Sequence, residues 1–129
     1  AARSADSLAV DAAVTARAAT PELVEIVERA GPFGAGNPEP VFAFPSHAVM
    51  YVDPVGNAHL RVRLRSGDGG ALNAIAFRAL DRPLGRALLA ARGQTMHLAG
   101  SLSIDRWQGQ ERVQLRLLDA APAEPLAAQ

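Results

Sequence analysis

Residues 31–40 restrict the path of this chain more than any other segment. The stretch GPFGAGNPEP holds three prolines, three glycines and an asparagine. Proline fixes its own φ and limits the residue before it, while glycine admits backbone conformations that other residues avoid. The segment therefore specifies one path, of the kind that joins two parts of a protein rigidly or surrounds a ligand. It also separates an N-terminal helical pattern from a series of strand patterns.

We expect a helix before this segment, over residues 20–30. Thr20 is a good N-cap, Pro21 suits the first helical position, and Glu22 is an acid in the first turn. Spacing predicts a buried stripe formed by Leu23, Ile26, Val27 and Ala30. Gly31 and Pro32 then end the helix. Residues 7–13 alternate loosely and predict a strand.

After residue 40 the period of apolar residues changes from 3.6 to 2. Strands are predicted at 41–44 with 48–52, then at 59–65, 72–77, 95–104 and 111–117, with turns at 53–57, 66–70 and 105–110. A short helix is predicted at 84–92. Three strands, a helix and two strands are the element order of a five-stranded Greek-key barrel of the OB type. Gly100, inside a strand, suits the sharp curvature of such a barrel. An SH3-like barrel is the competing fold, and it usually lacks the helix.

The predicted fold class is therefore mainly β, preceded by an N-terminal helix and a Gly/Pro-rich connector. We divide the chain into an N-terminal extension and connector (1–40), a barrel (41–122) and a flexible tail (123–129). A chain of 129 residues with 49% hydrophobic residues can bury a core. The absence of cysteine excludes disulfides and thiolate metal sites. No apolar run approaches the ~18 residues that span a bilayer, and we expect a cytoplasmic protein without a membrane partner.

The distribution of charge says more than its sum, which is zero. All 13 Lys or Arg residues are arginine, and they become dense from Arg61 onward. Arg61, Arg63 and Arg65 alternate with apolar residues, so they are predicted to form a row on one strand face at ~6.6–7 Å intervals. Phosphates of a nucleic-acid strand are separated by a similar distance, so the row could follow a backbone. A solvated face that serves only solubility is the alternative.

Four segments resemble the RecJ family of single-strand-specific 5′→3′ DNA exonucleases, which belong to the DHH phosphoesterase superfamily. Residues 32–42 resemble its PFGxGNPxPxF signature, residues 59–61 its HLR strand and residues 74–77 its AIAF strand. Residues 107–115 resemble its hairpin with WxG followed by VQL. The resemblance covers about residues 19–122 and implies an OB domain with its connector.

The resemblance also implies what this chain lacks. The family's metal site needs an Asp-His-His motif, and His47, His59 and His97 are isolated from one another. Two-metal hydrolysis requires several carboxylate and histidine ligands close together. We therefore expect a non-catalytic fragment with no catalytic or metal-binding residues and no cofactor. Mn²⁺ or Mg²⁺ is expected in a catalytic domain outside it.

The expected partners are single-stranded DNA and the nuclease core of the same protein. The candidate DNA-binding residues are Arg61, Arg63, Arg65, Trp107, Arg112, Tyr51 and His59. Trp107 and Tyr51 are candidates for stacking on bases, although Trp107 could instead cap the barrel end. Arg78, Arg106 and Arg116 could enlarge the basic surface. His59 could bind a phosphate or be merely structural, and we expect no chemistry from His47 or His97.

The connector motif comprises Pro32, Phe33, Gly34, Gly36, Asn37 and Pro38. Amides at residues 34–36 could form an anion-binding nest, but we favour a rigid hinge with Phe33 as its packing anchor. The predicted function is an OB domain that guides single-stranded DNA to a catalytic domain elsewhere, in DNA repair and recombination. The alternative is a structural or protein-interaction barrel that closes the nuclease ring without binding DNA. An RNA-binding OB domain is disfavoured only by the family motifs.

Overall fold

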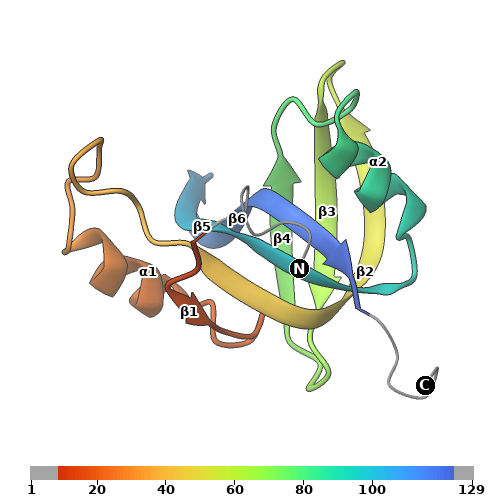
Figure 1. Cartoon of the computed structure of the whole chain (residues 1–129). Coiled ribbons are helices and arrows are strands. Elements are labelled where there is room, and N and C mark those ends of the chain that lie inside the picture. Colours follow the sequence, from red (N-terminus) through yellow and green to blue (C-terminus); the bar gives the residue numbers. More distant parts are fainter. Residues whose placement is uncertain (1–8, 124–129) are drawn as a thin grey trace.

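The computed structural model describes residues 9–123, apart from the side chain of Trp107. Its elements are, in order, β1 (Ala12–Ala13), α1 (Pro21–Glu28), β2 (Phe42–Val55), β3 (His59–Arg65), β4 (Ala71–Ala76), α2 (Pro83–Ala90), β5 (Thr95–Trp107) and β6 (Gln110–Pro122). In Figure 1, α1 and the loop after it lie on the opposite side of the barrel from α2. No helix within the described residues is long and apolar enough to cross a membrane.

Strands β2 to β6 form a closed barrel. The strand order is β1-β2-β3-β4-β6-β5, and pairing of β2 with β5 closes the sheet. The β4–β6 pair is parallel, while the other four pairs of barrel strands are antiparallel. With α2 between β4 and β5, this is the predicted OB fold. The mainly β fold class is confirmed, and the SH3-like alternative is wrong.

Helix α1 begins as predicted, and Leu23 and Val27 of the predicted stripe pack partly buried against the core, whereas Ile26 and Ala30 are exposed. The Thr20 hydroxyl accepts a hydrogen bond from the amide of Leu23 at 3.2 Å, and Pro21 follows at the first helical position. Val24 is fully buried, whereas Ile26 is 59% exposed. The helix contacts β5 and β6. Contact with these two strands decides which side chains are buried, and the helix's own periodicity cannot predict this contact.

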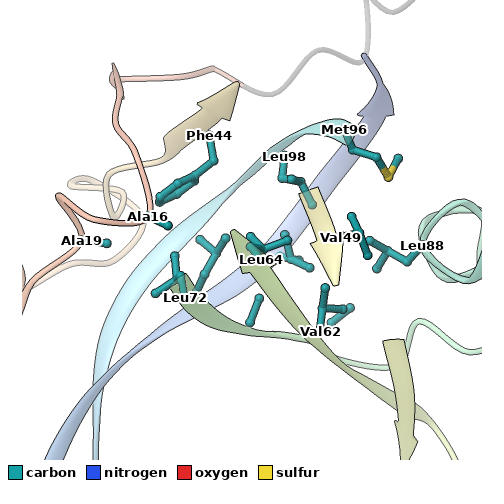
Figure 2. Packing of buried hydrophobic residues seen from close by; sticks show 14 of the residues in the cluster. Ala16, Ala19, Phe44, Val49, Val62, Leu64, Leu72, Leu88, Met96 and Leu98 are labelled. Carbon is teal, nitrogen blue, oxygen red and sulfur yellow. The ribbon is translucent and has the colours of Figure 1, made fainter. Parts of the chain in front are cut away.

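The barrel core is closed at one side by the N-terminal segment and at the other by α2. Ala16 and Ala19 are buried with the barrel residues, as is Leu88 of α2. Figure 2 shows Ala16 beside Phe44 and, on the other side of the core, Leu88 beside Val49. The amide of Ala16 donates to Nε2 of the buried His47 at 2.9 Å. The segment before the connector is thus part of the barrel's packing. The division at residues 40 and 41 stays a prediction.

Several strands are longer than predicted because pairing between strands outweighs local turn preference. The turn predicted at 53–57 is wrong, since β2 continues to Val55 opposite His59 and the turn covers 56–58. The β5–β6 turn is likewise shorter than 105–110, because Trp107 pairs with Gln110. Strand β6 runs to Pro122, and of the predicted tail only Ala123 is described. Of the strand predicted at 7–13, only residues 12 and 13 pair, and residues 7 and 8 lie outside the described residues.

Gly100 allows two strand backbones to approach closely where β5 curves. The β5–β6 register shifts between Ala99 and Gly100. A Cβ added at Gly100 would lie 2.0 Å from the carbonyl oxygen of Arg116 on β6. Any side chain here would have to push the strands apart, which explains why a glycine stands inside this strand.

Candidate nucleic-acid interface

Strand β3 presents its arginines on the outside of the barrel. Leu60, Val62 and Leu64 alternate with them and are fully buried. Arg61 and Arg65 are exposed and Arg63 is half-buried. The alternation predicted for this strand is therefore confirmed, and a role of the arginines in binding stays a prediction.

Arg63 is held in place by a neighbour on β4. Its Nη1 donates a hydrogen bond to Oδ1 of Asn73 at 2.7 Å. Tyr51 of β2 lies opposite Arg63 on the other side. A guanidinium has five N–H donors, so the bond to Asn73 orients the group and leaves further donors for a ligand. Sequence reasoning missed Asn73, although alternation along β4 marks it as an outward position.

The register of β3, β4 and β6 places outward side chains in two rows across these strands. One row contains Arg63, Asn73 and Gln114, and the next contains Arg61, Ile75 and Arg116. Neighbouring strands lie ~4.8 Å apart, so each row joins side chains from three strands over ~10 Å. We call the outward side chains of these three strands the basic face.

The first hollow on the basic face has a volume of about 310 Å³. Tyr51, Arg61 and Arg112 line it, together with Asn73, Ile75 and Asp105 among others. Tyr51 is 40% exposed. It stands in β2, within the strand predicted at 48–52. Three of the predicted residues, from β2, β3 and β6, thus meet around one hollow.

A second hollow of about 380 Å³ adjoins the first. Arg63 and the N-terminal residues Arg17 and Thr20 help to line it. The two hollows share Asn73, Arg112 and Val113. We therefore treat them as one groove that crosses the basic face and ends against the N-terminal segment.

Acidic side chains border the groove close to Arg61. Asp53 lies opposite Arg61 in the β2–β3 register, but no ion pair joins them in the described part of the chain. Glu111 lines the second hollow and pairs with Arg106, whose Nε lies 3.0 Å from Oε2. Asp105 lines the first hollow. The groove is therefore mixed in charge, with exposed guanidinium groups at Arg61 and Arg112 beside Asp105 and Glu111.

Arg17 connects the N-terminal segment to the β3–β4 loop. Its Nε lies 3.3 Å from Oδ2 of Asp68, and its Nη2 donates to the Asp68 carbonyl oxygen at 2.9 Å. The Ser66 hydroxyl, the Gly70 amide and Arg17 hold the pKa of Asp68 below its ordinary value of 3.8, because each stabilises the carboxylate. These contacts fix the end of the groove.

Arg65 and His59 lie outside the groove, and Arg112 within it already has a contact in the protein. Arg65 lines neither hollow of the groove. His59 accepts a hydrogen bond at Nδ1 from the amide of Arg78 at 2.9 Å, so it has a structural contact. Arg112 donates to Oε1 of Gln110 at 3.1 Å. The side chain of Trp107 lies outside the described residues.

The connector folds back on itself, away from the groove. Gly34 donates to the carbonyl oxygen of Asn37 at 2.8 Å, and the Asn37 amide donates back at 3.1 Å. The Asn37 side-chain nitrogen donates to the carbonyl oxygens of Ala30 and Pro32 at 3.1 and 3.0 Å. Since the Gly34 amide is used within the loop, these contacts favour the rigid-hinge interpretation over the anion nest. Contact between Phe33 and a nuclease core stays a prediction, as do the roles of Gly36 and Pro38.

The acidic and histidine side chains do not gather into a metal site within residues 9–123. No group of three or more His, Cys, Asp or Glu side chains there could hold an ion. What the groove offers is different chemistry: guanidinium groups for anions and an exposed phenol ring for planar groups.

Comparisons with known proteins agree with this fold. The model of the RecJ OB domain matches residues 10–119. RecJ from Thermus thermophilus in complex with Mn²⁺ is similar with a TM-score of 0.66 and 24% identity, over 92% of this chain and 16% of that chain. The structure of the Thermus protein with Mg²⁺ gives a TM-score of 0.54 and 27% identity, over 81% of this chain and 16% of that chain.

The same fold occurs in a protein of another kind. Asparaginyl-tRNA synthetase from Entamoeba histolytica is similar with a TM-score of 0.50 and 15% identity, over 78% of this chain and 24% of that chain. This likeness shows the fold alone. No protein with a curated description matches the chain. The chain spans about 16% of the length of the RecJ chains that it resembles.

Proposed function

The chain belongs to the RecJ OB-domain family, and on that premise we propose that it binds single-stranded DNA in the groove. The observation that carries this proposal is the meeting of Tyr51, Arg61 and Arg112 around the first hollow. A base stacked on an aromatic ring contributes ~1–3 kcal/mol to binding, and this stacking does not require a particular base. Guanidinium groups nearby bind the adjoining phosphates.

Geometry along β3 supports a strand that follows the arginine row. Alternate residues of a strand lie ~6.6–7 Å apart, which is close to the separation of successive phosphates in an extended strand. Arg63 is oriented before binding by Asn73, so less side-chain entropy is lost when it meets a phosphate. Arg61 is exposed and is able to follow the ligand.

For the intact protein we propose a 5′→3′ single-strand exonuclease that acts in bacterial DNA repair and recombination in the cytoplasm. The chain's own task is to hold the strand and direct it toward catalytic residues outside this segment. Hydrolysis by those residues would use Mn²⁺ or Mg²⁺ held there. The connector at residues 31–40 would set the angle between the groove and the nuclease core, since its hydrogen bonds make it stiff.

The proposal is tested by fluorescence anisotropy of labelled oligo-dT titrated with the 129-residue chain at low salt. Saturable binding is expected, with weaker binding to a duplex of equal length and a steep loss of affinity as salt rises. Absence of binding, or equal affinity for duplex, would refute it. Oligo-U of the same length measures the preference for DNA over RNA.

A second candidate function is a structural module that contacts the nuclease core and binds no DNA. Exposed apolar side chains on the N-terminal segment favour it, because Ile26 is 59% and Val10 is 47% exposed. The net charge of zero also favours it. Failure of the oligo-dT titration together with lower thermal stability of an intact protein carrying Ile26→Asp would support this candidate.

A further inference from the structure

A third hollow lies beyond the groove, where the end of β4 meets the start of α2 and strand β6. It has a volume of about 970 Å³. Its lining includes two aromatic side chains, His59 and Phe77, and Phe77 is 46% exposed. Arg78, Arg82 and Arg116 line it with the apolar side chains of Pro83, Leu84, Leu117 and Leu118. We call this hollow the Phe77 pocket.

The ring of Phe77 is held by contacts from two other strands. His59 of β3 meets it edge-on, with ring centroids 5.2 Å apart and planes at 76°. The Cζ atom of Arg116 on β6 lies 5.7 Å from the ring centroid. Because Nδ1 of His59 accepts the Arg78 amide, the hydrogen of a neutral imidazole lies on Nε2, where it is a donor. The pocket therefore combines a positioned aromatic ring with donors.

Charge distinguishes the Phe77 pocket from the groove. Three arginines line the pocket, and none of its lining residues in the described part of the chain is acidic. The groove, in contrast, contains Asp105 and Glu111. Arginines around an exposed aromatic ring suit a ligand that is both anionic and planar, as a nucleotide is.

The Phe77 pocket continues the path of the basic face. Arg116 lies in the same cross-strand row as Arg61. His59 precedes Arg61 by two residues on β3, a distance of ~6.6–7 Å or about one phosphate step. A strand that lies along Arg63 and Arg61 therefore arrives at Phe77 within one or two nucleotides.

From this continuity we infer that the Phe77 pocket is a second base-stacking subsite for the same DNA strand, with Arg78, Arg82 and Arg116 as its phosphate contacts. The inference rests on the proposed function, since it concerns a strand already bound in the groove. It assigns to the domain a longer binding site than the groove alone provides.

The test is an oligo-dT length series, from about 3 to 12 nucleotides, titrated into the chain and into its Phe77→Ala variant. Oligomers long enough to reach the pocket should bind the variant at least about 5-fold more weakly, from the loss of ~1 kcal/mol or more of stacking. The shortest oligomers should bind both proteins equally. A 2-aminopurine placed along the strand should show one position whose quenching disappears in the variant.

Ile26→Ala is the matched control, because Ile26 is also exposed and apolar but lies on α1 and lines none of the three hollows. Arg82→Gln is a second variant that keeps the Phe77 ring and should weaken only the long oligomers. If the native chain binds no oligomer at all, the proposed function fails. If it binds but Phe77→Ala and Arg82→Gln leave every length unchanged, this inference fails alone.

Discussion

The most direct test of the arginine row on β3 is to remove its exposed charges one at a time, Arg61 inside the groove and Arg65 outside it, and measure how binding depends on salt. Arg61 and Arg65 are the appropriate positions, because both are exposed and neither takes part in an ion pair within the described residues. Arg63 is less suitable, since its replacement would also leave Asn73 without its hydrogen-bond partner. Glutamine keeps part of the side-chain length and removes the charge.

The expected magnitude follows from counterion release. Each phosphate contact contributes about −0.7 to the slope of log K against log salt for a single strand, so Arg61→Gln and Arg65→Gln should each reduce the slope by ~0.7. The double variant should reduce it by ~1.4, and between ~50 and ~200 mM salt the native chain then loses about 7-fold more affinity than the variant.

The assay is anisotropy of labelled oligo-dT at several salt concentrations, with Arg29→Gln as the control. Arg29 is exposed at the end of α1 and lines none of the three hollows. A slope that changes equally in the control and in the Arg61 variant would mean that only net charge matters. An unchanged slope in both single variants would refute the arginine row as a phosphate path.

Three other changes test the ring, the barrel and the N-terminal contact. Tyr51→Ala should weaken oligo-dT binding by at least about 5-fold, through the loss of ~1 kcal/mol or more of stacking, with little change of salt slope. Gly100→Ala should lower the free energy of unfolding in urea by ~1–3 kcal/mol or more, because the added Cβ would lie 2.0 Å from a β6 carbonyl oxygen. Asp68→Asn should lower stability at pH 7, because the Ser66 hydroxyl and other partners depress the pKa of the carboxyl. Since that stabilisation is present above the ordinary pKa of 3.8 and is lost as pH falls through the lower folded pKa, the melting temperatures of the two proteins should converge in acid.

Each of these changes has a neighbour that serves as its control. Met50→Ala removes an exposed side chain next to Tyr51 that lines none of the three hollows, and it should leave binding unchanged. Gly67→Ala adds a Cβ with nothing within 4 Å, so it should be tolerated. Asp81→Asn, at another exposed loop carboxyl, controls for the loss of one surface negative charge. Equal effects of control and test variants would contradict the corresponding argument.

The local sequence pattern was sufficient to predict much of the fold. The apolar positions Leu60, Val62 and Leu64 alternate with arginines, and a period of 2 already places the two sets on opposite faces of a strand. Thr20 and Pro21 likewise mark the start of α1, because capping depends on residues next to each other in the chain. The order of strands and helix then predicted the OB barrel.

Local pattern was not sufficient for the ends of strands or for the buried face of α1. Val55 pairs with His59 and Pro122 pairs with Met96, so β2 and β6 extend past their predicted ends at residues 52 and 117. Val24 rather than Ile26 is buried because α1 contacts β5 and β6. Such contacts depend on elements far away in the sequence.

The sequence alone therefore determined which side chains of β3 face outward. The tertiary structure decided which residues of other elements lie next to them. Asn73 meets Arg63, and Arg116 meets Phe77, only because strand register places them together. A shift of one residue would turn every side chain of a strand to the other face, so register cannot be derived from either strand by itself. Burial of the apolar face sets that register when the barrel closes, and closure brings the groove and the Phe77 pocket into one path.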